Sequence, residues 1–258
     1  MDNEVLNRIT YILFFLTLIG CDQAKESVAV HNIDHRDTIY VMNIGQQIDD
    51  SIPDSLFLYR NLESLNLCCN KLSYFDPRIA DFSKLKSLDL YHTKISSLPD
   101  AFYSLSNIEE LDMTSMYELD YQSVLPQLHR FPKLKRLNLG CNQMKDPKID
   151  FSQMTNLEEF GFIRQEEIDI KLFLIALSEA KKLRVIHLSV NNIEALPPEI
   201  KLLSSLEELN LYDNKLNTLP KELTELKHLK KVTLIDNPIN EEKIKELERL
   251  MPNTKFIY

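Results

Sequence analysis

Glycine is scarce in this chain of 258 residues, which contains only four glycines. The glycine-dependent motifs GxGxxG, GxxxxGK[ST] and GxSxG are all missing from the sequence. Their absence excludes the dinucleotide-binding fingerprint, the phosphate-binding P-loop and the nucleophile elbow. We therefore expect a protein without a nucleotide cofactor, or any other cofactor.

Basic residues are also fewer than acidic residues. The chain has 30 Lys and Arg against 39 Asp and Glu, for a formal net charge of −9. Binding to nucleic acid depends on clustered Lys and Arg that neutralise phosphates, so we expect no nucleic-acid partner. Hydrophobic residues make up 44% and charged residues 27%, which is ordinary for a folded soluble protein.

An apolar run near the N-terminus is too short to span a membrane. Residues 9–19 read ITYILFFLTLI, whereas a membrane-spanning helix needs about 20 apolar residues. The length instead fits the core of a signal peptide, which has about 7–15 residues. The run leads directly into Leu18-Ile19-Gly20-Cys21.

This tetrapeptide resembles the lipobox of bacterial lipoproteins, in which the cysteine becomes the new N-terminus and carries acyl chains. The resemblance implies a signal peptide over 1–20, lipidation at Cys21, and a membrane anchor in the cell envelope, with the choice of membrane left open. Asp2 and Glu4 precede Arg8, so the leader is less positive than usual. The alternative is an uncleaved apolar segment that caps a cytosolic protein.

Leucine recurs along most of the chain with a fixed spacing. The pattern LxxLxLxxNxL begins at nine positions that are 23 or 26 residues apart, namely Ile39, Leu62, Leu85, Ile108, Leu134, Leu157, Leu183, Leu206 and Leu229. It resembles the leucine-rich repeat over residues 39–239. The resemblance implies an α/β solenoid of about nine repeats, with short parallel strands on a concave face and helical, 3-10 or irregular segments on a convex face.

The spacing has a physical meaning. The LxL core alternates inward and outward, as a strand must, and no repeat can bury its apolar face without its neighbours. At the Asn position, a side-chain amide can pair with buried backbone groups of the neighbouring repeat. Asn70, Asn142, Asn191, Asn214 and Asn237 occupy this position, Gln47, Thr93 and Gln165 are polar substitutes, and Met116 cannot play the role well.

Two repeats and both ends depart from the pattern. The two 26-residue repeats contain residues 121–129 and 171–179, which we expect to form helical turns on the outer face, as a packing adjustment or as a binding feature. Residues 21–38 are interpreted as a lipid-anchored tether and N-terminal cap. Residues 240–258 predict a capping helix with Asn240 as its N-cap, followed by an edge strand. The helix should cover the last repeat with Ile244, Leu247, Leu250 and Met251.

Outward-facing strand residues should line the concave face. Nine strands about 4.8 Å apart give a face roughly 40 Å long, which suits a macromolecule better than a buried small molecule. Tyr212 and Ile235 supply apolar area of the kind that anchors interfaces, although scattered apolar residues are also ordinary on soluble surfaces. The candidate binding residues are Asn66, Asp89, Tyr91, Asp112, Asn138, Tyr212 and Ile235.

Two pairs of residues are candidates for catalytic or metal-binding groups. Asp89 and Asp112 occupy equivalent positions on adjacent strands, close enough to raise the pKa of one of them. A glycosidase would also need a water-excluding cleft, which an open sheet lacks, and a calcium ion would need more ligands. Cys69 and His92 are likewise equivalent, but Cys141 should lie about 14 Å from Cys69. We expect no enzyme, no metal site and no disulfide scaffold.

These observations favour a non-catalytic recognition module on a bacterial lipoprotein. It would bind a protein or another macromolecule through the concave face, as a monomeric solenoid on a membrane surface. The alternatives are a cytosolic leucine-rich-repeat adaptor or effector and a carbohydrate-binding envelope protein.

Overall fold

The computed structural model describes residues 40–142, 144, 147–165 and 168–258. The predicted signal peptide, the predicted lipidation site Cys21 and the predicted tether and N-terminal cap lie outside the described residues. None of the described helices is both long and apolar enough to cross a lipid bilayer.

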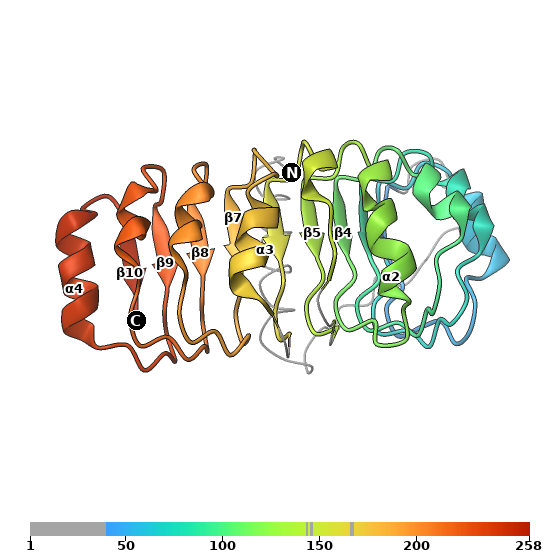
Figure 1. Ribbon diagram of the computed structural model, residues 1–258. Coiled ribbons are helices and arrows are strands. Elements are labelled where there is room, and N and C mark those ends of the chain that lie inside the picture. Colours follow the sequence, from blue (N-terminus) through green and yellow to red (C-terminus); the bar gives the residue numbers. More distant parts are fainter. Residues whose placement is uncertain (1–39, 143, 145–146, 166–167) are drawn as a thin grey trace.

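Ten three-residue strands form one parallel sheet in which every strand pairs with the next along the chain. The sheet lines one side of a curved solenoid, and the helices lie along the other side (Figure 1). The nine predicted repeats supply β1 to β9, and the C-terminal tail adds β10. The strands are β1 Val41–Asn43, β2 Ser64–Asn66, β3 Ser87–Asp89, β4 Glu110–Asp112, β5 Arg136–Asn138, β6 Glu159–Gly161, β7 Val185–His187, β8 Glu208–Asn210, β9 Lys231–Thr233 and β10 Lys255–Ile257.

Short helices return the chain on the convex side. The 3-10 helices are η2 Asp54–Leu58, η3 Pro77–Asp81, η4 Asp100–Ser104, η5 Leu125–Arg130, η6 Phe151–Gln153, η7 Pro198–Leu202 and η8 Lys221–Glu225. The α-helices are α2 Tyr121–Val124, α3 Ile170–Leu177 and α4 Glu241–Leu250. α2 with η5, and α3, fall in the two 26-residue repeats, so the predicted outer helical turns are confirmed.

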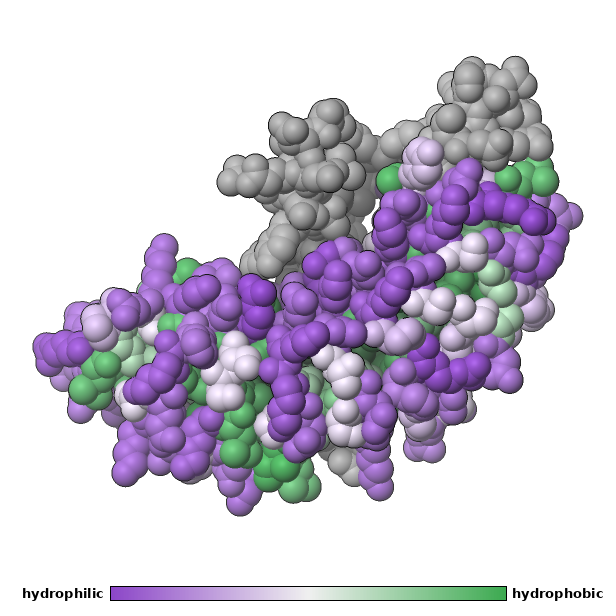
Figure 2. Space-filling view, turned by 90° about the horizontal axis from the view of Figure 1, so that it is seen from above, coloured by the Kyte–Doolittle hydropathy of each residue, from purple (hydrophilic) through white to green (hydrophobic). Residues whose placement is uncertain are grey.

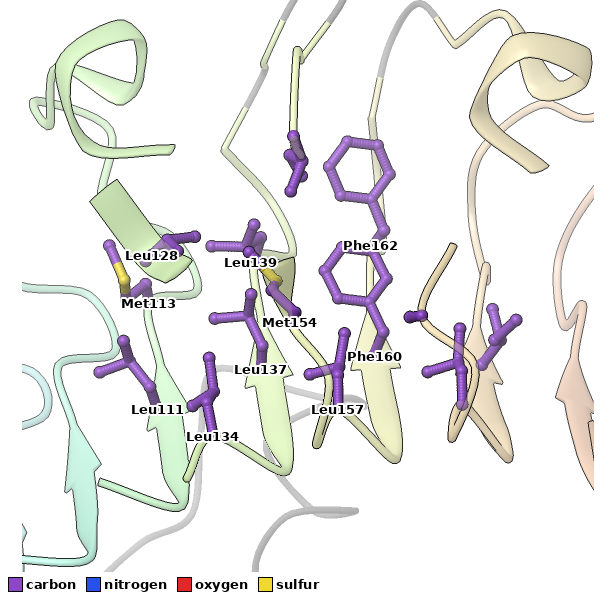
Figure 3. Packing of buried hydrophobic residues seen from close by; sticks show 14 of the residues in the cluster. Leu111, Met113, Leu128, Leu134, Leu137, Leu139, Met154, Leu157, Phe160 and Phe162 are labelled. Carbon is purple, nitrogen blue, oxygen red and sulfur yellow. The ribbon is translucent and has the colours of Figure 1, made fainter. Parts of the chain in front are cut away.

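The core is a continuous stack of leucine layers between the sheet and the convex helices. Leu111, Leu137 and Phe160 occupy the middle of successive strands and are fully buried, and Figure 3 shows them side by side in this stack. Near α3 the leucines give way to aromatic rings, and the Phe162 and Phe173 centroids lie 4.7 Å apart. Each repeat therefore buries its apolar face only against its neighbours.

The predicted pairing by the Asn position is confirmed. In Asn214, Oδ1 accepts hydrogen bonds from the backbone N–H groups of Asn191 and Ile193, each at 3.0 Å. Its Nδ2 donates to the carbonyl oxygens of Leu188 at 2.9 Å and Leu211 at 3.0 Å. One buried side chain thus satisfies four backbone groups of two repeats.

The substitutes at this position behave differently from one another. Gln165 is buried and accepts from the backbone N–H of Met144 at 3.1 Å, as an asparagine would. Gln47, in the first repeat, is exposed. Met116 has no polar group to offer, but its own N–H is bound by Asn142 Oδ1 of the next repeat at 2.8 Å.

A left-handed residue precedes the Asn position in each repeat, which the sequence pattern did not reveal. In the first eight repeats its backbone N–H donates to the next repeat, as from Cys69 to the Tyr91 carbonyl at 2.7 Å. None of these residues is a glycine. They are Gln46, Cys69, His92, Ser115, Cys141, Arg164, Val190, Asp213 and Asp236, with φ between 50° and 63°.

The C-terminal cap differs from its prediction in one residue. Asn240 accepts a hydrogen bond from the Glu242 N–H at 2.7 Å, which confirms the N-cap. Ile244, Leu247 and Met251 are buried, but Leu250 is 63% exposed, so the expectation that Leu250 covers the last repeat was wrong. Steps of three and four residues keep the first three on one helix face, and Leu250 falls outside it.

Charges alternate along one edge of the sheet, at the residue that follows each leading Leu or Ile. From the second repeat onward this charge ladder comprises Glu63, Lys86, Glu109, Lys135, Glu158, Arg184, Glu207 and Lys230. Five of the seven adjacent pairs form ion pairs in the described residues, such as Glu109 to Lys135 at 2.7 Å. Glu207 pairs with Arg184 at 3.0 Å on one side and with Lys230 at 2.6 Å on the other.

Candidate binding surface

The third residue of each strand forms a row across the concave face. Parallel pairing in register places Asn66 beside Asp89, Asp89 beside Asp112, and Asp112 beside Asn138. The predicted adjacency of Asp89 and Asp112 is therefore confirmed, and Asn66 and Asn138 flank the pair.

Most of this row is engaged by local backbone groups. Oδ1 of Asp89 accepts from the Tyr91 N–H at 2.8 Å, and Oδ1 of Asp112 accepts from the Thr114 N–H at 2.8 Å. The same turn, in which an Asn or Asp oxygen binds the N–H two residues later, occurs at Asn43, Asn66, Asn138 and Asn210. These side chains end the strands, which is a structural reason for their residue types.

Hydrogen bonds also run along the row. Asn66 Nδ2 donates to Asp89 Oδ2 at 3.0 Å, and Asn138 Nδ2 donates to Asp112 Oδ2 at 3.3 Å. Each carboxylate oxygen of Asp89 and Asp112 thus already accepts a hydrogen bond from the protein. Asp112 is 7% and Asn138 1% exposed, so these two predicted binding residues have little surface to present to a partner.

Gly161 makes room for this arrangement. A Cβ at position 161 would lie 2.7 Å from Asn138 Oδ1, which is too close for any side chain. Asn138 therefore leans over the neighbouring strand where no side chain opposes it. This close approach is a packing role for one of the few glycines in the chain.

The carboxylate pair is electrostatically coupled, as predicted. Burial raises the pKa of Asp89 to about 8, and the negative charge of Asp112 adds to this, while the Tyr91 N–H opposes it. Burial also raises the pKa of Asp112, against hydrogen bonds from Thr114 and Asn138. The pair therefore holds a proton near neutral pH, chiefly because burial disfavours the charged carboxylate and also because the two like charges repel.

Sequence reasoning missed a second buried polar pair, on β6 and β7. His187 Nε2 lies 3.1 Å from Glu159 Oε1, and both residues are buried. On β4 and β5, Glu110 forms an ion pair with Arg136. Both pairs could have been found from the sequence, because their residues occupy outward positions of adjacent strands. Side chains on one face of paired strands are neighbours.

The remaining predicted residues divide into two groups. Tyr212 is 38% and Ile235 39% exposed, at equivalent positions of neighbouring repeats. Asn66, Asp89 and Tyr91 are half-buried. Tyr91 and Tyr212 lie five strands apart, or roughly 24 Å, so the predicted residues do not form one compact site.

Cys69 and His92 do not form a metal centre with other ligands. In the described ranges, no group of three or more His, Cys, Asp or Glu side chains is placed to hold a metal ion. The His92 ring instead lies 5.9 Å from Tyr91 and 6.1 Å from Tyr117. Cys68, Cys69 and Cys141 form no disulfide within the part of the chain that the structure describes.

The convex side carries exposed apolar residues that sequence reasoning did not single out. Leu172 and Ile175 on α3 are 60% and 40% exposed, and Leu202 on η7 is 44% exposed. Figure 2 shows a mostly hydrophilic surface in which hydrophobic residues gather in small patches. Leu172 and Ile175 thus offer a matched comparison for Tyr212 and Ile235 on the concave side.

Comparisons with known proteins agree with the repeat pattern. A leucine rich repeat family model matches residues 60–115 and 181–239. The unmatched stretch between them contains most of both 26-residue repeats. Among curated proteins, none matches the chain in sequence.

Solved structures with the same architecture come from bacteria and from an insect. A leucine-rich-repeat protein of Leptospira interrogans has 19% identity and a TM-score of 0.50, covering 85% of this chain and 72% of its own. Internalin C2 of Listeria monocytogenes has 24% identity and a TM-score of 0.59, covering 77% and 82%. Drosophila Toll, solved in complex with Spätzle, has 20% identity and a TM-score of 0.62, but only 27% of that chain is spanned, against 78% of this one.

These likenesses concern the fold, since the identities are low. Together with the matched repeats and the ten-stranded parallel sheet, they show that the described part of the chain is a leucine-rich-repeat solenoid.

Proposed function

We propose that the chain is a non-catalytic recognition module that binds a protein through the C-terminal part of its concave face. An acylated Cys21 would hold it on a bacterial membrane surface. The observation that carries the binding proposal is the exposure of Tyr212 and Ile235 side by side on neighbouring repeats. The Toll neighbour was solved with a protein ligand, which is consistent with recognition as a use of this fold.

The surroundings of Tyr212 support its role as an anchor. A hydrogen bond to Asp236 raises the pKa of the Tyr212 hydroxyl, and the negative charge of Asp236 adds to this effect. Asp213 and Asp236 are exposed beside the apolar pair. An aromatic residue with its polar end satisfied, surrounded by polar groups, is typical of residues that dominate interface energies.

The binding proposal is tested by comparing two faces. The partner is first cross-linked to the wild-type protein in the native host and identified, and its affinity is then measured with purified variants. Tyr212→Ala with Ile235→Ala should weaken binding at least tenfold, since anchor residues contribute about 2 kcal/mol or more. Leu172→Ala with Ile175→Ala on the convex face should leave the affinity unchanged. A loss of affinity only in the convex-face variant would refute the proposal that the concave face binds the partner.

The anchor proposal is tested separately, by mass spectrometry of the N-terminus from the native host. An acylated peptide that begins at Cys21, and is lost in Cys21→Ala, would support the lipoprotein assignment. An unmodified N-terminus upstream of Cys21 would refute it and favour the cytosolic adaptor. Either result leaves the test of the concave face intact.

A further inference from the structure

Two adjacent thiols lie on the concave side directly after β2. Cys68 takes the outward position of Tyr212 in its own repeat, and Cys69 follows in the left-handed conformation with φ of 60°. Both residues are half-buried. The Cys68 N–H donates to Asn66 Oδ1 at 2.8 Å, and the Cys69 N–H donates to the Tyr91 carbonyl at 2.7 Å. The backbone thus holds both thiols in place.

The preceding repeat leaves space for one of the two sulfurs. A Cβ on Gly45 would lie 2.9 Å from Cys68 Sγ and 3.0 Å from the Cys68 carbonyl oxygen. Gly45 has no positive φ, so close approach is the reason for glycine here. Cys68 is therefore packed over the backbone of Gly45, and Cys69 lies beside it at the turn.

The surroundings distinguish the two thiols chemically. Hydrogen bonds from Cys68 and Gln46 lower the pKa of Cys69 to about 7, against the effect of burial. The hydrogen bond to Cys69, burial and the negative charge of Asp89 raise the pKa of Cys68. Cys68 is thus the proton donor of the pair, and Cys69 carries the thiolate, which is the reactive form.

We propose that Cys68 and Cys69 form a reactive dithiol, in which Cys69 exchanges with low-molecular-weight disulfides while Cys68 remains a thiol. The Cys69 thiolate attacks one sulfur of R–S–S–R, a Cys69–S–S–R bond forms, and the R–S–S–R bond breaks. The leaving R–S⁻ takes its proton from water, so the disulfide is the oxidant and no other reagent is required.

Ring closure between the two cysteines is disfavoured. Consecutive Cα atoms are about 3.8 Å apart across a trans peptide, below the usual range of about 4.4–6.8 Å for a disulfide. Cys68 therefore cannot readily displace the R group, and the mixed disulfide persists.

The test uses the full-length reduced protein and oxidised glutathione, with peptide mapping to follow each cysteine separately. Cys141 is the internal reference, because it occupies the same left-handed position with φ of 56° but follows Gly140 instead of a cysteine. At pH 6 the thiolate fraction of a thiol of pKa 7 exceeds that of an ordinary thiol about thirtyfold. Its lower intrinsic nucleophilicity reduces this advantage to roughly sixfold.

The expected result is glutathionylation of Cys69 faster than that of Cys141 at pH 6, and about sixfold faster than that of an ordinary thiol, with a rate midpoint near pH 7. Cys68→Ala should move this midpoint upward, and Cys68→Ser should retain it because the hydroxyl still donates. Cys69→Asn removes the reactive thiol in a residue that tolerates the left-handed conformation, so this variant should fold normally and lose the fast reaction. Equal rates and midpoints at Cys69 and Cys141 would overturn the proposal, and so would a Cys68–Cys69 disulfide as the main product.

Discussion

At the residue scale, the turn after each of the first nine strands contains a residue in the left-handed backbone conformation. Within the described residues, ten non-glycine residues have positive φ, and nine of them stand just before the Asn position. Asn and Asp tolerate the left-handed region, whereas a β-branched residue is a genuine outlier there. Val190, with φ of 60°, is such an outlier. The hydrogen bond of its N–H to the Tyr212 carbonyl at 2.9 Å holds it in place.

Replacing Val190 by glycine should stabilise the protein. The left-handed conformation costs a residue with a side chain about 1–2 kcal/mol, and part of the gain is offset by the greater freedom of glycine in the unfolded chain. We expect Val190→Gly to raise the free energy of unfolding by about 1 kcal/mol in urea denaturation. Val185→Gly, in strand β7, should lower it. Equal destabilisation by both substitutions would show that Val190 is not strained.

The Asp89 and Asp112 pair predicts a dependence of stability on pH. The folded-state pKa of Asp89 is raised to about 8, above the unfolded value of about 3.9. The folded state therefore binds more protons between these values, and stability should fall as pH rises from about 4 to 8. Stability measured for wild type minus Asp89→Asn should decline over this interval by up to about 5 kcal/mol, because each pKa unit between the folded and unfolded states corresponds to about 1.4 kcal/mol. A difference that does not change with pH would rule out a raised pKa.

At the scale of elements, the contribution of a side chain to stability depends on which face of its helix it occupies, as in α4. Ile244 is fully buried against the last repeat, whereas Leu250 of the same helix is 63% exposed. The cap covers apolar residues that would otherwise end the stack in water. Hydrophobic residue type alone therefore predicted too wide a contact face.

Truncating these two residues separates cap packing from general hydrophobicity. Ile244→Ala should cost about 2–4 kcal/mol of unfolding free energy, because it leaves a cavity under the cap. Leu250→Ala should change it by less than about 0.5 kcal/mol. Urea denaturation of both variants measures the difference in unfolding free energy. A large loss of stability in Leu250→Ala would contradict the exposure of Leu250.

At the scale of the whole molecule, the described repeats are held together along the solenoid by interactions between neighbouring repeats. Leucine layers, the Asn positions and the charge ladder all connect one repeat to the next. Because the ladder alternates in sign, each inner member has opposite charges at the same position on both sides. Lys135, for example, pairs with Glu109 at 2.7 Å, and Glu158 follows it in the ladder.

Reversing one member of the ladder should therefore oppose two neighbours at once. Lys135→Glu should lower the free energy of unfolding by about 1 kcal/mol, and Lys135→Gln by less, because the second change adds no like charge. The loss in Lys135→Glu should shrink in 0.5 M salt, which screens such charges. A loss that is equal in low and high salt would point to packing instead of charge.

Most of the fold could be predicted from residue spacing, while much of the candidate site could not. The strand and convex positions follow from the leucine period, and Asn214 shows the expected bonding to two repeats. Asp112 and Asn138 were expected to face a partner but are nearly buried. An outward direction follows from alternation along a strand. Exposure depends instead on the side chains of adjacent strands, which spacing does not describe.

Sequence by itself determined that this chain is a stack of leucine-rich repeats, because no single repeat can bury its apolar face and the period specifies which residues must be inside. Only the tertiary structure decided which outward residues bind other side chains of the protein and are therefore less available to a partner. Hydrogen bonds between adjacent strands engage Asn66, Asp89, Asp112 and Asn138 in this way. The tertiary structure also decided that the Cys68 sulfur lies over Gly45. Residues 23 positions apart become neighbours only when the repeats stack, so their local chemistry cannot be seen in the linear pattern.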